Sequence, residues 1–510
     1  MATSTSNSRH LRSGDDGDSD YGSDFSVGEE LLVDRLLQSI ASGSHAPPSL
    51  ALADLARHPA AVPPPFASGL VSPAATDDNK SILSLDSIRY PDLSHALSNL
   101  KAPQETDQTI PLPPVKSPVE QPFPTVKGEA LTPLQRFRAF PKRPLTVSDV
   151  VSGAWCELQH FYTLALLPHG RKTRNAAMRG GSRVHQTLED EVHQTVRVEI
   201  TTKEEAFALR LWNVIQGLRT LRETGLTREL EVWGFIHREP VNGVIDQLSH
   251  KSPDANWEEE LSNSSAPSTQ QSSITDYLLS SSHKTVYLTD VKTRGSDKLP
   301  SGTAFRPARV QLLVYYRLLA DMAADRLDYD AVLDRYGLDG SSRFSDAFIA
   351  QIGNLHDEIF YDADSAVAEN TSDDSSSVDF IRYRSVTQLI TLLKSELKTT
   401  FPAGPESIGN LLAVEYRHRD DGRVLGKNTF LNDPEGLDAY IKHTLRWWRG
   451  EREPDGVAIE ETYKCGWCEF AEGCQWRKDK EAEFLEKKRG SKVAGGRFSR
   501  EPSVQSLPAS

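Results

Sequence analysis

The sequence predicts an α/β fold in which a small mixed β-sheet is flanked by helices on both faces. Segments with helical spacing of apolar residues alternate with short apolar or alternating runs typical of strands. These segments lie between about 131 and 480, and stretches poor in apolar residues surround and interrupt them. Mixed order of helices and strands favours a mixed sheet covered by helices over an all-β or all-helical fold.

Helices are expected first, and Ser148 gives the first of them a helix-start signal. Three runs that read as strands follow, the third after a polar segment, and a strongly amphipathic helix comes next. The expected helices span 145–164, 174–196, 203–224, 304–324 and 434–449, and the expected strands span 230–237, 241–248, 285–293 and 411–417.

The domain organisation follows from composition. Residues 1–130 are rich in Ser, Asp, Pro and Ala, and such a segment buries too little apolar surface to offset its chain entropy. We expect it to be disordered except for a short helix at 29–40. The folded domain is expected at 131–480, with low-complexity insertions at about 251–284 and 359–380. Residues 481–510 are expected to form a basic, flexible tail.

The formal net charge of -14 does not by itself favour a nucleic-acid-binding protein. The acidic residues, however, concentrate in the N-terminal extension and the two insertions, which leaves a small basic excess elsewhere. No stretch reaches the roughly 18 apolar residues that a membrane helix needs, and the start lacks an apolar signal core. We therefore expect an intracellular protein that does not engage the membrane.

The strongest local signal is the run Leu288 to Thr293, which places Asp290 and Lys292 two residues apart on a strand. Strand periodicity directs both side chains to one face. Asp246 ends another apolar strand run. Two carboxylates at the ends of neighbouring strands form a site for a hard cation, and a nearby lysine can position or deprotonate a water molecule. The alternative for Asp290 and Lys292 is an exposed ion pair at a strand edge.

Two helical pairs fit the same interpretation. His185 and Glu189 are four residues apart on one predicted helix face, as are Gln311 and Tyr315 on the helix after the Asp290 strand. The ordinary alternatives are a surface histidine for His185 and a core aromatic residue with a solvated hydroxyl for Tyr315.

The four cysteines give a second signal. Cys465, Cys468 and Cys474 form a C-x2-C-x5-C pattern, and Cys156 lies far upstream. In an intracellular chain this arrangement favours a metal over disulfides. Zinc sites usually combine two paired knuckles, which this chain lacks, whereas a cubane iron–sulfur cluster tolerates irregular spacing. A cluster is therefore favoured, while zinc and free buried thiols remain open.

Taken together, these motifs resemble those of the exonuclease V family, RecB-like members of the PD-(D/E)XK nuclease superfamily. The resemblance covers about 145–478, and its ordered motifs with the split cysteines are highly specific. The matching segments are Ser148-Asp149-Val150 through Trp155-Cys156-Glu157-Leu158-Gln159, Gly181 to Glu189, Gly243-Val244-Ile245-Asp246, Asp290-Val291-Lys292-Thr293-Arg294, Gln311 to Tyr315, and Cys465 to Cys474.

The resemblance implies a Mg²⁺-dependent (or Mn²⁺-dependent) exonuclease for single-stranded DNA, entering from the 5′ end. Its domain would be closed by a 4Fe–4S cluster on Cys156, Cys465, Cys468 and Cys474. It also implies that the cation is surrounded by His185, Asp246, Asp290 and the Val291 carbonyl, that Lys292 serves the water, and that Gln311 and Tyr315 complete the site. Glu189 is a further candidate for this site.

Strand binding requires basic surface. The candidate DNA-binding residues are Arg171, Lys172, Arg174, Arg179, Arg294 and Arg306. A solvated surface charge is the alternative for each of them.

Two rival functions are a catalytically silent nucleic-acid-binding protein on the same fold and a zinc-stabilised interaction module. We expect a monomer that acts on single-stranded DNA, with a single-strand-binding protein as a candidate partner. The first dozen residues contain Arg9 and Arg12 and no acid, which resembles a mitochondrial leader, although the acidic run from Asp15 argues against a long one. Fungal-type relatives are mitochondrial, so mitochondria are favoured and the nucleus is the alternative. A role in DNA maintenance or repair follows from the resemblance.

Overall fold

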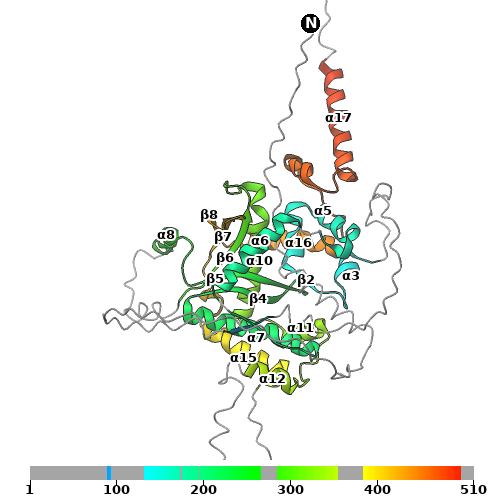
Figure 1. The fold of residues 1–510 in the computed structure, drawn as a ribbon. Coiled ribbons are helices and arrows are strands. Elements are labelled where there is room, and N and C mark those ends of the chain that lie inside the picture. Colours follow the sequence, from blue (N-terminus) through cyan, green and yellow to red (C-terminus); the bar gives the residue numbers. More distant parts are fainter. Residues whose placement is uncertain are drawn as a thin grey trace, which may run out of the picture.

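A six-stranded mixed sheet forms the centre of the protein in the computed structural model, which describes residues 89–92, 131–172, 175–192, 194–265, 284–353 and 383–495 (Figure 1). The strands are β2 (Leu145–Thr146), β4 (Leu226–Ile236), β5 (Glu239–Ser249), β6 (Tyr287–Arg294), β7 (Leu411–His418) and β8 (Val424–Leu431). Strands β4 and β5 form a long antiparallel hairpin, and β5 also pairs antiparallel with β6. Strand β6 in turn pairs in parallel with β7. The last strand returns antiparallel, and a two-residue strand joins in parallel at the hairpin.

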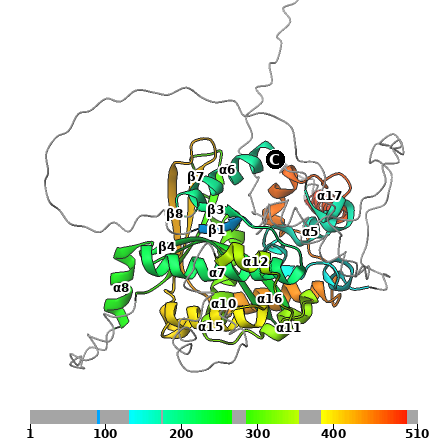
Figure 2. The ribbon, with the colours of Figure 1, turned by 60° about the horizontal axis from the view of Figure 1, so that its bottom comes forward.

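Helix α7 (Lys203–Thr224) covers one face of the hairpin. It begins at a capping box made by Thr202 and Glu205, and it ends at Gly225, whose φ of 82° suits only a residue without a Cβ. Its Phe207 ring packs against Trp233 of β4. On its other side α7 lies along α15 (Val386–Thr400), as both Figure 1 and Figure 2 show.

Helix α10 (Arg306–Ala323) covers the opposite face. Its Leu318 lies so close to Gly234 that a Cβ there would meet the leucine at 2.5 Å. Gly234 follows Trp233 directly, and successive strand residues point to opposite faces. The sheet is therefore flanked by helices on both faces, which confirms this part of the predicted architecture.

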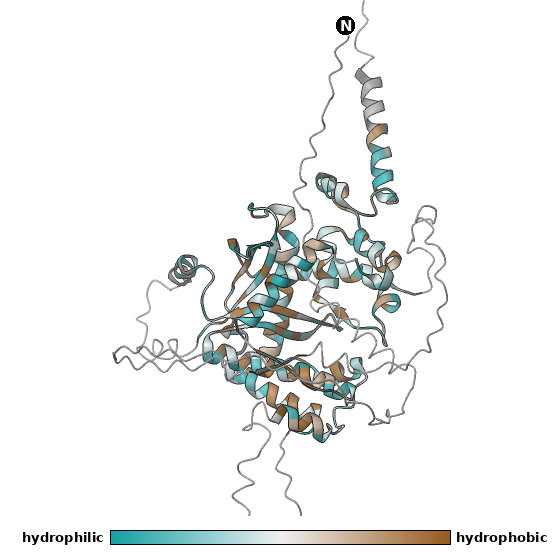
Figure 3. Ribbon diagram, viewed as in Figure 1, coloured by the Kyte–Doolittle hydropathy of each residue, from teal (hydrophilic) through white to brown (hydrophobic). Residues whose placement is uncertain are grey.

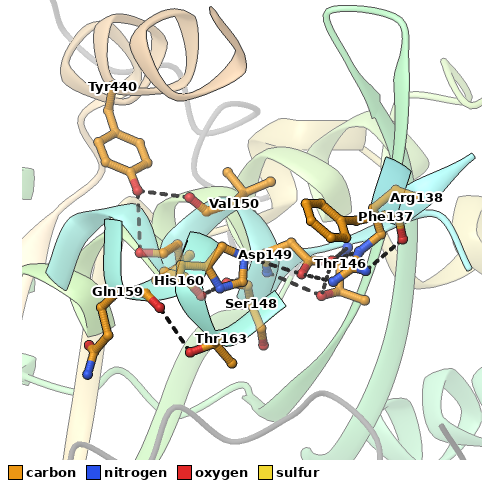
Figure 4. Close-up of polar contacts among 12 residues, drawn as sticks. Phe137, Arg138, Thr146, Ser148, Asp149, Val150, Gln159, His160, Thr163 and Tyr440 are labelled. Carbon is orange, nitrogen blue, oxygen red and sulfur yellow. Dashed lines mark hydrogen bonds and ion pairs between the residues drawn. The ribbon is translucent and has the colours of Figure 1, made fainter. Parts of the chain in front are cut away.

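The first ordered helices meet the last helix of the sheet region at one corner of the core. Here α3 (Pro133–Arg138), α4 (Val147–Val151) and α5 (Gly153–Leu166) lie beside α16 (Pro434–Trp448). Arg138 donates to the buried Asp149 carboxylate at 2.7 Å, and Tyr440 of α16 donates to the Val150 carbonyl at 2.8 Å (Figure 4). The second of these bonds connects segments that lie 290 residues apart in the chain.

His160 lies in this corner, edge-on to Trp447 and Trp448 at ring-centroid distances of 5.9 Å. Its Nε2 atom is 3.7 Å from Asp149 Oδ1 (Figure 4). Burial lowers the pKa of His160 from 6.5 to about 4, even though the Asp149 carboxylate favours the charged ring. The histidine is thus neutral in the folded protein near neutral pH.

This neutral histidine predicts a loss of stability in mild acid. Between the unfolded pKa of 6.5 and the folded pKa of about 4, the unfolded chain binds a proton that the folded chain does not. Stability should fall as the pH drops through that window, by about 1 kcal/mol at about pH 5.5. His160→Phe should lose less stability than the wild type between about pH 7.5 and pH 5.5. Equal losses in melting temperature would contradict this assignment.

The other elements surround this core, and Figure 3 shows that hydrophobic residues concentrate on the sheet and on the inner faces of its helices. Helix α17 projects from the domain (Figure 1). No helix in the described ranges is long and apolar enough to cross a membrane. The remaining elements are α6 (Ala176–Asp190), α8 (Ala255–Ser265), α11 (Tyr329–Tyr336), α12 (Asp346–Gly353), α17 (Gln475–Gly495), β1 (Arg89–Asp92) and β3 (Gln194–Arg197), with short 3-10 helices that include η2 (Pro168–Gly170), η3 (Gly302–Ala304), η5 (Gly404–Ser407) and η6 (Ile459–Trp467).

Several expected elements need correction. The helix expected at 145–164 is divided into β2, α4 and α5, and Thr146 caps α4 in place of Ser148. The helix expected at 174–196 ends at Asp190, and β3 follows it. β3 pairs in parallel with β1, which lies within the extension expected to be disordered. β1 is short and contains Pro91, so its sequence carries no strand signal.

Two segments expected to lack structure contain helices. The segment expected as an insertion from 251 includes α8, and α17 extends through the start of the segment expected as a flexible tail. Runs rich in Glu, Lys and Arg have high helix propensity, which the composition argument did not weigh. The helix expected at 29–40 and the insertion at 359–380 lie outside the described residues.

Candidate functional site

Three carboxylates lie in one row across adjacent strands. The pairs Arg228 with Gln247 and Leu230 with Ile245 place Glu229 of β4 opposite Asp246 of β5. The last backbone pair of β5 with β6 joins Gln247 to Thr289, so the same register places Asp290 at the level of Asp246. Opposite residues on antiparallel strands have Cβ atoms about 5 Å apart. The hairpin and β6 thus bring together one acid from each of three strands.

Asp246 is joined to β6 through its side chain. The Val291 N–H donates to Asp246 Oδ2 at 2.7 Å, beyond the last backbone pair that links β5 and β6. The backbone of Val291 therefore contacts this carboxylate. Its predicted role as a carbonyl ligand stays a prediction.

Asp290 and Lys292 lie as the strand periodicity predicts. Lys292 Nζ donates to Asp290 Oδ1 at 3.0 Å, and the two side chains are 12% and 1% exposed. The second oxygen of Asp290 is buried with no hydrogen-bond partner among the described residues. Burial raises the pKa of Asp290 above its usual range, Lys292 opposes this, and the Asp246 charge adds to it. This carboxylate oxygen is of the type that serves as a ligand for a hard cation.

His185 comes to the row from α6, which Asn175 caps. Its Nδ1 atom is 3.7 Å from Glu229 Oε1. Ligand atoms of His185, Glu229 and Asp246 all lie within 4.8 Å of one another. Burial alone would lower the pKa of His185, but the charges of Asp246 and Glu229 outweigh it and raise that pKa to about 9.

Glu229 was missed in the sequence analysis, which began the strand one residue later. The signal that could have found it is the hairpin turn. His237 and Arg238 both have positive φ, as in a two-residue type I′ turn, and a two-residue turn fixes every pair along the hairpin. Glu229 itself has a φ of 51°, unusual for a residue with a side chain.

Gln311 and Tyr315 share one face of α10, and Gln311 Nε2 donates to the Tyr315 hydroxyl at 3.2 Å. The Gln311 side-chain oxygen is buried, and no described residue forms a hydrogen bond with it. Tyr315 lies against Gly243 of β5, three residues before Asp246, where a Cβ would meet its ring and Val147 at 2.7 Å. Gly243 is therefore required for α10 to approach the sheet.

Gly243→Ala should destabilise the protein by about 1–3 kcal/mol, because α10 and α4 both pack against this position. Gly466→Ala is the matched control, since Gly466 has open space around its Cα. Chemical denaturation of both variants measures the difference. Equal stability of the two variants would show that Tyr315 and Val147 yield easily.

The four cysteines line one pocket, together with aromatic residues that include Trp155, Tyr162 and Phe470. Cys156 reaches it because its backbone is extended, which breaks α5 at that residue. Burial and, to a smaller extent, the other three cysteines raise the pKa of Cys156 to about 12. No three of these sulfur atoms lie within 4.8 Å of one another.

Hydrogen bonds of Glu157 and Leu158 hold α5 beside the pocket. Arg452 Nη2 donates to Glu157 Oε1 at 2.8 Å, and the Asp455 N–H donates to Glu157 Oε2 at 2.9 Å. The Leu158 N–H, freed by the break at Cys156, donates to the Asp455 carbonyl at 2.9 Å. These hydrogen bonds connect the part of α5 next to Cys156 to the C-terminal segment.

The candidate DNA-binding residues divide into groups. Arg306 forms an ion pair with Glu461, and Lys172 lies 3.6 Å from Glu469, so both contact acids of the cysteine segment. The Arg294 guanidinium lies over the Tyr416 ring, and Arg179 is exposed on α6. Arg171 is described and only partly exposed. Arg174 lies outside the described residues.

Glu189 is less central than the sequence indicates. It lies on α6 and accepts from Gln186 at 3.3 Å. It contributes to the electrostatic environment of Glu229 but is outside the group formed by His185, Glu229 and Asp246. Its role stays a prediction.

The fold and this site define an α/β protein with a row of carboxylates, which are ligands suited to a hard cation, beside a histidine and a lysine. A family model described as "Exonuclease V - a 5' deoxyribonuclease" matches residues 132–477. This match covers more than half of the chain, so the protein belongs to the exonuclease V family, as the sequence motifs predicted.

Curated relatives agree with this assignment. The chain is similar to "Exonuclease V" of Danio rerio, 26% identical over 353 residues that cover 69% of this chain and 74% of the relative. It is also similar to "Exonuclease V, mitochondrial" of Candida glabrata, 24% identical over 408 residues that cover 66% and 80%. The match to the Candida albicans protein of that name is shorter, with 26% identity over 123 residues that cover 22% and 20%.

Proposed function

We propose that this protein is a metal-dependent exonuclease that hydrolyses phosphodiester bonds of single-stranded DNA on a PD-(D/E)XK core. The observation that carries the proposal is the meeting of Asp246, Asp290 and Lys292 beside His185. A catalytically silent binding protein would have no need to hold an acid and a lysine together in a buried position.

The described residues fit Mg²⁺ or Mn²⁺. The buried Asp290 oxygen that lacks a partner among the described residues would be one ligand. His185 and Asp246, whose ligand atoms lie close together, and the Val291 carbonyl would be further ligands. A cation bound there supplies a Lewis acid for water and for the phosphate oxygens. Lys292 holds or moves a proton of the attacking water, because Asp290 fixes its ammonium group 3.0 Å away. Gln311 and Tyr315 complete the site from α10.

The cysteine pocket fits a 4Fe–4S cluster better than zinc. Zinc–sulfur bonds of about 2.3 Å would place the sulfur atoms less than 4 Å apart, whereas no three of them lie within 4.8 Å here. A four-iron cluster is a larger body that takes four thiolates. Aromatic side chains around the pocket would shield it from water.

The names of the relatives support the proposed substrate and compartment. The family description names a 5′ deoxyribonuclease, which supports digestion from the 5′ end. The fungal relatives are named mitochondrial, which supports a role of this chain in maintaining mitochondrial DNA. We expect a monomer, with a single-strand-binding protein as its candidate partner. Incubating the protein with oligonucleotides labelled at either end, single- or double-stranded, with Mg²⁺ or EDTA, tests polarity and strand preference directly.

Asp290→Ala should abolish cleavage and leave DNA binding in EDTA largely intact, because it removes a proposed ligand rather than a phosphate contact. Lys292→Ala should also abolish cleavage, since loss of a catalytic acid or base typically costs about a hundredfold or more. Asp297→Ala, an exposed acid just beyond β6, is the matched control. Cutting by either site variant at more than about a tenth of the wild-type rate would exclude the proposed site.

Cys156→Ser should be as damaging as Cys465→Ser, because one cluster would join both ends of the domain. Each should lose iron and visible absorbance, from near four irons per chain in the wild type. Arg452→Met is the matched control, since it removes the hydrogen bond from Arg452 to Glu157 without removing a thiol. Full iron content in Cys156→Ser would show that this cysteine is not a ligand, and zinc in the wild type would favour the alternative metal.

A further inference from the structure

The structure contains one acid at the cation site that lies outside the family motifs quoted above. We infer that Glu229 is a ligand of the divalent cation, together with His185 and Asp246. This inference rests on the proposed function and adds a residue from β4 to a set of proposed cation ligands that otherwise come from α6, β5 and β6.

The position of Glu229 follows from the hairpin register. Pairs are formed on both sides of Glu229 and Asp246, at Arg228 with Gln247 and at Leu230 with Ile245, but not between the two acids themselves. The backbone pairing of the hairpin is thus interrupted where the Glu229 and Asp246 carboxylates lie opposite each other. The same level on β6 holds Asp290.

The distances suit a small cation. Octahedral Mg²⁺ with ligands at about 2.1 Å places neighbouring ligand atoms about 3 Å apart. His185 Nδ1 and Glu229 Oε1 are 3.7 Å apart, and Asp246 offers an oxygen within 4.8 Å of both. Small side-chain movements close this gap. The His185 and Glu229 side chains are 26% and 33% exposed, which leaves room for the waters that Mg²⁺ usually keeps.

An independent observation points to a ligand in the same space. Asp290 Oδ2 is buried and has no hydrogen-bond partner in the part of the chain that the structure describes, and Asp290 interacts electrostatically with both Asp246 and His185. A buried carboxylate oxygen without a partner is costly unless a cation or water satisfies it. Asp246 also commits one oxygen to the Val291 N–H, so a further anionic ligand from β4 completes the set.

Glu189 is the natural comparison because it is an acid on the same helix as His185. Its carboxylate accepts a hydrogen bond from Gln186. Glu189 is not part of the group formed by His185, Glu229 and Asp246, whose ligand atoms lie within 4.8 Å of one another. Replacement by glutamine is therefore expected to weaken cation binding at Glu229 but not at Glu189.

Binding of Mn²⁺ to the full-length protein, followed by electron paramagnetic resonance of the free ion, tests the inference without relying on cleavage. Loss of an outer-sphere partner already costs about 10–100-fold in metal affinity, so Glu229→Gln should bind Mn²⁺ at least about tenfold more weakly than the wild type. Glu189→Gln should bind within about threefold of the wild type. Cleavage by Glu229→Gln should recover as the Mn²⁺ concentration is raised.

Melting temperature in EDTA and with Mn²⁺ separates folding from binding. Both glutamine variants should melt like the wild type in EDTA, and added Mn²⁺ should stabilise Glu229→Gln less than the others. If Glu229→Gln is unstable in EDTA, Glu229→Asp keeps the charge, and its Mn²⁺ affinity should fall between those of the wild type and Glu229→Gln. Wild-type affinity in Glu229→Gln overturns the inference while the proposed function stands. A wild-type protein that neither binds Mn²⁺ nor cuts overturns both.

Discussion

The bond from the Val291 N–H to the Asp246 carboxylate determines how the centre of the sheet is organised. Backbone pairing of β5 with β6 extends over only three residues on each strand, and this side-chain bond extends the connection to the level of the acids. A buried N–H left without an acceptor would be costly. The same carboxylate that anchors β6 therefore also lies in the site, and this bond holds Asp290 and Lys292 of β6 beside Asp246.

Charge at this level is unevenly distributed. Lys292 lies against Asp290 at one end of the row, and His185 lies near Glu229 at the other. Burial raises the pKa of Glu229, and the Asp246 charge raises it further, although His185 opposes the shift. Like-charged groups in a partly dry environment repel one another strongly. A bound cation would relieve this repulsion, which explains why a fold would retain acids on three adjacent strands.

Sequence reasoning recovered the elements whose signals are local. Helix α7 was predicted with both boundaries correct, because Thr202 and Glu205 form a capping box and Gly225 ends the helix. Asp246, Asp290 and Lys292 were found because they directly follow or lie within apolar strands. The edge strand β8 was missed since its residues are mostly half-exposed and lack clear alternation. Helix α15 was missed because its apolar face is recognisable only once its partner α7 is known.

Other features depend on contacts that no local pattern encodes. The break in α5 at Cys156 is stabilised by Asp455, about 300 residues later in the chain. Glu229 became visible only through the register of the hairpin. A site assembled from several elements can be predicted by motif only for the residues that each motif contains.

The hydrogen bonds of Glu157 to Arg452 and Asp455 can form only late in synthesis of the chain. Glu157 emerges from the ribosome long before Arg452 and Asp455, to which it bonds. The strands that carry Asp246 and Asp290 are complete before that point, so the nascent chain can assemble its acidic row while α5 is still unattached. A chain that terminates before Arg452 would expose the buried Glu157 carboxylate and the inner surface of α5. Quality-control proteases would then meet an almost complete nuclease whose first and last segments have never been joined.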